Sequence, residues 1–345
     1  MVHVYFKRFK GDPSTEIVKS MSRQLLDHIV TVEKIELEKE IPLKVHFGEK
    51  GNVTYIQAEN YDGVIDFLQD RKITSCFIET TVLYGGQRYR RDLHLKTAAE
   101  NGFTRIPVII ADGDHGESFS EIEIHKTHFE KCKIASGFAK YSQLIVLAHF
   151  KGHGLSGFGG AIKQLSMGHA SKGGKLEMHL GIKPKIKSRK CEQCGLCQKK
   201  CAENAITIGE KSRIDPALCV GCGACVAICP NQAVTVFTVR GIGHAVFGNR
   251  FKEKLVEYAY AGQKGKKNIY LNFLMNITRG CDCEGRKMSV IIKDIGILAS
   301  TDPVAIDKAS FDLVKKAGKK FRGFSTFAYA EKIGLGSADY TLKEI

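Results

Sequence analysis

The chain has 345 residues, 43% of them apolar, and a formal net charge of +15, so it is long enough for one large domain or for two to three modest ones. No apolar run approaches the roughly 20 residues that a membrane-spanning helix needs. The first residues, MVHVYFKRFKGD, include neither an apolar signal segment nor a small-residue cleavage site. We therefore expect a cytoplasmic protein that does not enter a membrane.

The basic excess is concentrated in short runs, above all in residues 183–200, which contain seven basic residues and one acidic residue. Such runs can contact nucleic acid, an anionic metabolite or an acidic redox partner, and a solvated basic face explains them equally well. No RNP, helix-turn-helix or zinc-finger spacing accompanies the charge. We expect no nucleic-acid partner, and a redox partner such as a ferredoxin or another acidic electron carrier.

The N-terminal half alternates between strand-like and helix-like segments. Expected strands are 3–9, 42–48, 74–82, 106–113 and 143–150, and expected helices are 14–30, 60–71 and 90–103, the last closed by Gly102. Such alternation predicts an α/β fold, with a mixed or largely parallel sheet and helices on both of its faces.

A glycine-rich loop follows the strand at 143–150 and contains G-x-G-x-x-G at Gly152, Gly154 and Gly157. A dinucleotide-binding turn also needs an acidic residue about 20 positions later, at the end of a second strand. The run GGKLEMH contains an acidic residue but is not a convincing strand, and no Gly-Lys-Ser/Thr of a P-loop is present. The chemical groups of the loop are His149, His153 and Lys163, as acid/base groups, ligands or an anion-orienting cation, although a glycine turn with a buried histidine is an alternative.

Eight of the twelve cysteines lie in two runs with identical spacing. Residues 191–201 read CEQCGLCQKKC and residues 219–230 read CVGCGACVAICP, so each contains C-x2-C-x2-C-x3-C. This spacing is typical of two-cluster ferredoxins, in which the fourth cysteine of each run binds the cluster of the other run. We expect two [4Fe–4S] clusters, the first held by Cys191, Cys194, Cys197 and Cys229 and the second by Cys219, Cys222, Cys225 and Cys201.

The residues around these runs also fit a ferredoxin module. Residues 205–219 read as strand, turn and strand, and 233–237 as a further strand. Zinc ribbons use C-x2-C pairs, and two four-cysteine runs do not suit them. We therefore expect an inserted α+β two-cluster module at 187–237, although Ala202 stands where a proline would follow the first run.

The C-terminal part returns to the α/β pattern. Helices are expected at 249–266 and at 302–318, the latter with Asp302 as N-cap and Pro303 at the first helical position. A strand is expected at 268–275, and residues 288–300 form an apolar stretch. Between these two stretches, RGCDCEGR contains Cys281 and Cys283, which would face the same way on a strand. Such a pair can bind metal, accept electrons, cycle as a dithiol or be structural, and the flanking arginines favour thiolates.

Five stretches of the sequence carry a family pattern, namely 149–168, 79–103, 110–116, 294–313 and 329–345. Together they resemble the uncharacterised iron–sulfur-centre proteins of domain-of-unknown-function family 362. The sequence departs from the family pattern at His169, where cysteine is common, and at Arg91-Asp92, where small polar residues are common. The resemblance implies one α/β host domain, formed by 1–186 and 238–345, with the ferredoxin inserted. The pattern His…Gly-Phe-Gly-Gly…Lys also looks like the N-domain of lactate racemase.

These observations predict an iron–sulfur electron-transfer protein, an oxidoreductase that passes electrons from two clusters to a pocket in the host domain. The pocket would take a small anionic substrate or a second cofactor, either a flavin or a second metal. A non-enzymatic redox sensor or a metal or cluster carrier is the alternative. The expected pocket residues are the catalytic candidates His149, His153, Lys163, Cys281 and Cys283 and the substrate-binding candidates Thr80, Tyr84, Arg88, His94 and Asp112.

Overall fold

A mixed eight-stranded sheet forms the centre of the protein, with the order β16-β1-β15-β14-β7-β2-β3-β4. The computed structural model describes residues 2–84, 86–179, 183–201, 203–219, 224–231, 233–235 and 250–345. Strand β15 is antiparallel to both of its neighbours, and the other neighbouring pairs are parallel. The strands are β1 (Val2–Arg8), β2 (Leu43–Lys44), β3 (Phe77–Glu79), β4 (Val108–Ile110), β7 (Ile145–His149), β14 (Ile269–Leu274), β15 (Gly296–Ser300) and β16 (Tyr340–Glu344).

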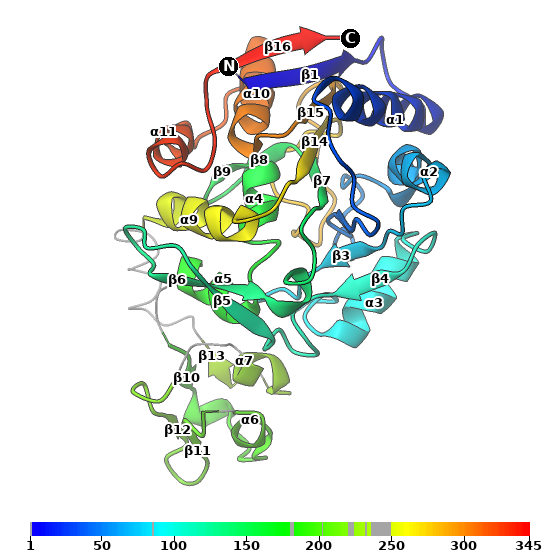
Figure 1. The fold of residues 1–345 in the computed structure, drawn as a ribbon. Coiled ribbons are helices and arrows are strands. Elements are labelled where there is room, and N and C mark those ends of the chain that lie inside the picture. The colour runs from blue at the N-terminus through cyan, green and yellow to red at the C-terminus, as the bar shows by residue number, and fades with distance from the viewer. Residues whose placement is uncertain are drawn as a thin grey trace.

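Helices cover both faces of this sheet, as the alternating pattern predicts (Figure 1). Helices α1 (Thr15–Val32), α2 (Asp62–Asp70) and α3 (Arg91–Glu100) pack on one face, and α4 (Ala161–Ser166), α9 (Phe251–Gln263), α10 (Pro303–Lys316) and α11 (Ser325–Lys332) on the other. Consecutive strand residues alternate between the two cores, as Tyr5 and Phe6 do, because successive side chains of a strand point to opposite faces.

Local sequence signals account for several helix ends. The hydroxyl of Ser14 accepts from the backbone N–H of Ile17 at 3.4 Å and caps α1. The carboxylate of Asp302 accepts from the N–H groups of Val304 and Ala305, at 2.8 and 2.9 Å, and Pro303 begins α10. The cap expected at 302–303 is therefore confirmed, and it satisfies N–H groups that have no partner inside the helix.

Two further elements lie beside the face covered by α9. Strands β5 (Phe119–Glu123) and β6 (Lys131–Ala135) form an antiparallel hairpin, and helix α5 (Lys172–His179) packs between β6 and α9. Among the described residues, no helix is both long and apolar enough to cross a bilayer.

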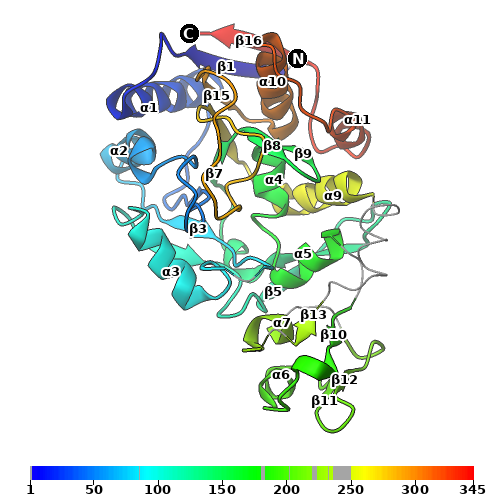
Figure 2. The same ribbon diagram turned by 180° about the vertical axis from the view of Figure 1, so that it is seen from behind.

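Residues 183–235, which we call the cysteine segment, lie beyond α5 at one end of the molecule (Figures 1 and 2). Strand β10, where the segment begins, pairs with β13 near its end, with Ile186 opposite Val234. The expected strand, turn and strand at 205–219 is the β11–β12 hairpin. The elements are β10 (Lys185–Ile186), α6 (Leu196–Lys199), β11 (Ile206–Thr207), β12 (Arg213–Ile214), α7 (Ala224–Ile228) and β13 (Val234–Thr235).

Candidate functional site

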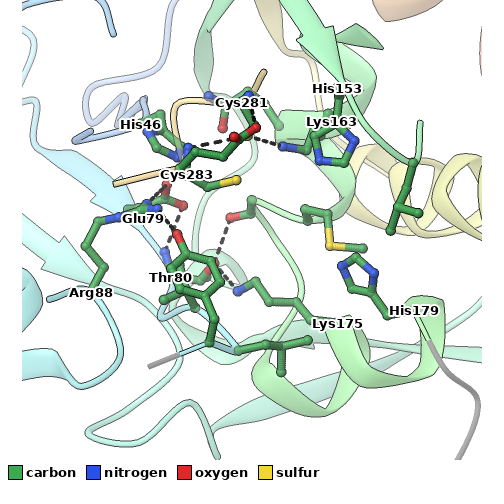
Figure 3. A pocket seen from close by; sticks show the side chains of 18 of the residues that line it. His46, Glu79, Thr80, Arg88, His153, Lys163, Lys175, His179, Cys281 and Cys283 are labelled. Atoms are coloured by element: carbon green, nitrogen blue, oxygen red, sulfur yellow. Dashed lines mark hydrogen bonds and ion pairs between the residues drawn. The ribbon is translucent and has the colours of Figure 1, made fainter. Parts of the chain in front are cut away.

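A pocket of about 360 Å³ lies where β3 and β7 end, at the edge where the carboxyl ends of parallel strands meet and where α/β proteins commonly bind ligands. Its walls come from the residues after β3, the loops after β7, helices α4 and α5, and the loop of Cys281 and Cys283 (Figure 3). Seven of the ten predicted pocket residues line it, namely Thr80, Tyr84, Arg88, His153, Lys163, Cys281 and Cys283.

The glycine-rich loop forms a small hairpin, in which β8 (Lys151–His153) pairs with β9 (Gly157–Gly159). The glycines of the G-x-G-x-x-G pattern lie in this hairpin, whereas the last glycine of a dinucleotide turn lies close to a helix start. At Gly157 φ is +91°, and a Cβ would lie 2.1 Å from the carbonyl oxygen of Arg322. Only glycine fits there, and it turns β8 back so that His153 faces the pocket.

Helix α4 begins directly after this hairpin and holds Lys163 at the pocket. The Asp307 carboxylate, from α10, accepts from the N–H groups of Ala161 and Ile162 at 2.7 and 2.9 Å. A Cβ on Gly160 would lie 2.2 Å from the same carboxylate. Burial raises the pKa of Asp307 to about 6, against the opposing effect of these hydrogen bonds. The close approach of Asp307 therefore depends on a glycine at 160 and fixes the first turn of α4.

Cys281 and Cys283 lie on a turn and not on the predicted strand. The residue between them, Asp282, points the other way and is fully buried. Its carboxylate lies 2.9 Å from Nδ1 of His149 and 2.6 Å from Nζ of Lys151. Burial alone would raise the pKa of Asp282, but the facing His149 and Lys151 lower it below its usual value. The anchored carboxylate holds both cysteines toward the pocket.

His149 therefore lies behind the pocket wall, not on it as the sequence predicted. Its Nε2 donates to the carbonyl oxygen of Met275 at 2.8 Å while Nδ1 faces Asp282. The ring sits at the end of β7, where Phe273 of β14 is its partner in the sheet. With both ring nitrogens engaged, His149 positions the cysteine loop and does not contact a ligand in the pocket.

Four reactive groups meet on one wall of the pocket (Figure 3). One nitrogen of His153 and the sulfurs of Cys281 and Cys283 all lie within 4.8 Å of one another, and Nζ of Lys163 lies 3.0 Å from Sγ of Cys281. A hydrogen bond from the Cys283 thiol and the Lys163 charge hold the pKa of Cys281 well below its usual value. The same hydrogen bond and burial raise the pKa of Cys283, so Cys281 is the more acidic of the two thiols.

The facing wall carries Tyr84 and Arg88, whose donors are largely used inside the protein. Arg88 Nε donates to Glu49 at 3.2 Å and its NH2 donates to the Tyr84 hydroxyl at 2.6 Å. Its NH1 lies 3.9 Å from Glu79. Both residues line the pocket, but the guanidinium is held by two carboxylates and offers a bound anion fewer free donors than the sequence suggests.

Two predicted substrate-binding residues do not line the pocket. Asp112 is fully buried and accepts from the backbone N–H and the hydroxyl of Thr81, at 2.9 and 2.8 Å. His94 is buried in α3 against Phe47, with both ring nitrogens lacking a partner among the described residues. Burial lowers the pKa of His94 well below its usual value. Asp112 therefore supports the segment after β3 from behind, and His94 belongs to the core between α3 and Phe47.

The sequence analysis missed three residues that shape the site. Glu79, the last residue of β3, pairs with the buried Lys44 at 2.7 Å. Lys175 of α5 donates to the Thr80 hydroxyl and to the carbonyl oxygens of Thr81 and Ala170, at 2.7, 2.6 and 2.9 Å. No spacing pattern in the sequence indicates Lys175 or Glu79. The third residue, Asp282, could have been predicted because it stands between the two cysteines.

The cysteine segment contains a second, smaller cavity. It is lined by Cys191, Cys194, Cys197 and Cys229, which come from both runs. The fourth cysteine of each run accepts a backbone N–H in the same way, from Ala205 to Cys201 at 3.3 Å and from Ala233 to Cys229 at 3.2 Å. None of the eleven described cysteines forms a disulfide, and Cys222 lies outside the described residues.

This segment contacts the host domain close to the pocket. The Tyr89 hydroxyl donates to the carbonyl oxygen of Val226 at 3.1 Å, and the preceding residue, Arg88, lines the pocket. Lys172 donates to the carbonyl oxygen of Tyr89 at 2.9 Å. A salt bridge of 2.9 Å also joins Lys200 to Glu117.

Comparison with known proteins identifies a family but no activity. The model described as "Domain of unknown function (DUF362)" matches residues 41–312, and no curated protein matches the sequence. A Thermotoga maritima protein superposes with a TM-score of 0.40 at 10% identity, over 90% of this chain and 59% of that one. The lactate racemase apoprotein of Thermoanaerobacterium thermosaccharolyticum gives 0.38 at 12%, over 80% and 51%, so this chain spans between half and three fifths of these two proteins. On the family match, the chain belongs to the DUF362 family.

Proposed function

We propose that the protein is an iron–sulfur oxidoreductase in which two [4Fe–4S] clusters pass electrons to the pocket of the host domain. The observation that carries this proposal is the cavity lined by Cys191, Cys194, Cys197 and Cys229. Three cysteines of the first run and the last of the second are the set that the crossed ligation of a two-cluster ferredoxin requires. Cys201, Cys219, Cys222 and Cys225 would hold the second cluster, and bound clusters would supply single-electron steps.

The contact between the two regions supports an electron route. Tyr89 bonds to the backbone of α7 at Val226, and Arg88, next to it in the chain, lines the pocket. Helix α7 ends at Ile228, directly before Cys229, an expected ligand of the first cluster, so the tyrosine contacts the helix that leads to this ligand. Two consecutive residues, Arg88 and Tyr89, thus connect the pocket wall to the cysteine segment.

The charge of the pocket favours a small anionic substrate. Arg88 and Lys151 line it but are paired with Glu49 and Asp282, and the lining carboxylates Glu79 and Glu284 are paired with Lys44 and Arg286. Lys163 and Lys175 also line it, and among the described residues neither forms a salt bridge with a carboxylate. A mostly enclosed pocket with a few convergent polar groups is typical of a small-molecule site, and an excess of positive charge raises the local concentration of anions. The thiols of Cys281 and Cys283 and the imidazole of His153 provide groups for proton transfer.

A test of this function uses protein purified without oxygen and reduced with dithionite, from which the excess reductant is removed. The reduced protein is mixed with a panel of small carboxylates and oxyanions, and the return of cluster absorbance is followed. We expect at least one acceptor to reoxidise the clusters quickly in the wild type and in Cys132→Ala, and slowly in Cys283→Ala. Equal rates in all three proteins would show that electrons leave the clusters without passing through the pocket, as in a sensor or carrier.

A further inference from the structure

We propose that His153, Cys281 and Cys283 bind one divalent, thiophilic metal ion of the zinc type, with a fourth coordination position open to the pocket. This inference deepens the proposed function, on which it rests for the role of the pocket, by naming the second cofactor there. Two thiolates and one imidazole are a ligand set that zinc uses in catalytic sites, where three protein ligands leave one position for substrate or water.

The spacing of the three ligand atoms fits one ion. They lie within 4.8 Å of one another, and the ligand atoms of a tetrahedral zinc with ~2.3 Å bonds to sulfur are separated by somewhat less than this. The ligands come from two rigidly held places. The Gly157 turn fixes His153 on its hairpin, and the buried Asp282 anchors the cysteine turn. A small closing movement of side chains completes the site without a change in the backbone.

The sulfur of Cys281 already receives the hydrogen bonds that a metal-bound thiolate needs. Nζ of Lys163 lies 3.0 Å from it, and the backbone N–H of Cys283 donates to it at 3.4 Å. Because the thiolate is the ligand form of cysteine, these two donors prepare Cys281 for a metal. They also orient its sulfur, as hydrogen bonds around a ligand do in metal sites.

The imidazole of His153 is oriented for the same purpose. Nδ1 lies 2.9 Å from Oγ of Ser156, whose own proton goes to the carbonyl oxygen of Phe158 at 2.6 Å. The hydroxyl oxygen can therefore accept a hydrogen bond from Nδ1–H, and in that tautomer Nε2 is unprotonated and free to be the ligand atom. Without a metal, the backbone N–H of Ser156 at 3.1 Å can instead donate to Nδ1, so metal binding selects one tautomer of this ring.

The net charge of the site with its metal bound would favour an anion as the fourth ligand. Two thiolates neutralise a divalent ion, and the Lys163 ammonium beside them leaves the centre with one positive charge. Arg88 and Lys175 line the same pocket. A small carboxylate at the open position would therefore be favoured over a neutral ligand.

Zinc K-edge X-ray absorption tests the site directly, because this edge is separate from that of the cluster iron. Cluster-loaded wild-type protein is incubated with one equivalent of Zn²⁺ and desalted. We expect retention of about one zinc, with two sulfur neighbours at ~2.3 Å and two nitrogen or oxygen neighbours at ~2.0 Å. A shell of four sulfurs would place the zinc in the cysteine segment and overturn the proposal.

Matched variants identify the ligands without any assay of turnover. Cys281→Ser, Cys283→Ser and His153→Ala should each weaken zinc binding at least tenfold in competition with a chelator, while iron content and circular dichroism stay unchanged. Cys76→Ser, which changes a buried cysteine outside the pocket, should bind zinc as the wild type does. Unchanged zinc affinity in both pocket cysteine variants, or a Cys281–Cys283 disulfide that persists in protein purified without oxygen, would overturn the metal site. Because cluster iron is counted separately, loss of the clusters would contradict the proposed function and leave the zinc result interpretable.

Discussion

The central sheet and the cysteine segment differ in the length of their strands. Strands β7, β14 and β15 of the sheet have five or six residues, all of them buried, whereas each strand of the cysteine segment has only two residues. The two cores of the sheet contain apolar side chains from nearly every helix around it. The buried core found in the segment consists of Cys197, Ile206, Cys225 and Val234, and two of these four are expected cluster ligands.

This contrast indicates that the two regions are stabilised by different forces. Burial of apolar surface is the main stabilising term for the sheet. A unit as small as the segment rarely folds on apolar burial alone, and small metal-binding domains commonly unfold when the metal is removed. The predictions that follow begin with the largest expected effect, which tests this division directly.

Removal of iron should reveal the largest difference in stability between the two regions. Chelation of anaerobic protein should unfold residues 183–235 and leave the α/β host folded, since the host core shares no residue with that of the segment. Limited proteolysis should then cut within the segment alone, and a protein with 187–237 replaced by a Gly/Ser linker should unfold at the same denaturant concentration as the chelated one. Cooperative loss of the whole fold on chelation would show that the segment supports the host.

Within the host, the buried charges behind the pocket should matter most. Asp282→Asn leaves His149 and Lys151 without their carboxylate, and breaking a buried ion pair in this way costs about 3–5 kcal/mol of unfolding free energy. Asp114→Asn removes one carboxylate from an exposed pair with Arg91 and should change stability little. Denaturant unfolding measures both variants, and equal small losses would mean that Asp282 is not an anchor.

The start of α4 should tolerate almost no added volume. Gly160→Ala would place a methyl group against the Asp307 carboxylate, and such overpacking costs about 1–3 kcal/mol. Gly154→Ala, in the same loop, adds a methyl group with no atom within 4 Å and serves as the control. If the two variants melt at the same temperature, Asp307 can move away and the helix start is not fixed as we describe.

The last expected effect is a change in the pH dependence of stability. Burial lowers the pKa of Lys172 to about 7, against the opposing charge of Asp112, with Lys175 adding to the decrease and Glu117 opposing it. Between pH 7 and about 10 the unfolded chain therefore binds more protons at this site than the folded protein, so stability should rise with pH. Lys172→Met should flatten that rise. An identical pH dependence in wild type and variant would show that Lys172 keeps an ordinary pKa.

The strands and helices of the sheet could be predicted because the signals for them lie within a few neighbouring residues of the sequence. Burial on both faces makes β7 and β14 continuous apolar runs, and the caps at Ser14 and Asp302 depend on residues within one helical turn. The segment expected at 106–113 is shorter and less buried than predicted. Its strand, β4, lies at the edge of the sheet, and a run of apolar residues does not reveal its position in the strand order.

The sequence indicated the site residues only where the side chain is itself reactive, as in histidine, lysine and cysteine. His153, Lys163, Cys281 and Cys283 stood out by type and neighbourhood, and they line one pocket. The placement of His149 behind that pocket depends on Asp282, which lies 133 positions away in the chain. Thr80 and Lys175 meet across 95 positions, and such pairings are set by tertiary packing and not by any local pattern.

The central claim is that the cysteine segment holds two clusters with crossed ligands, and the iron and sulfide content of protein purified without oxygen tests it most directly. We predict about eight irons and about eight sulfides per chain. Electron paramagnetic resonance of the reduced protein should show loss of the first-run cluster in Cys229→Ser and of the second-run cluster in Cys201→Ser. Stoichiometric zinc without sulfide, or loss in each variant of the mutated run's own cluster, would contradict the account.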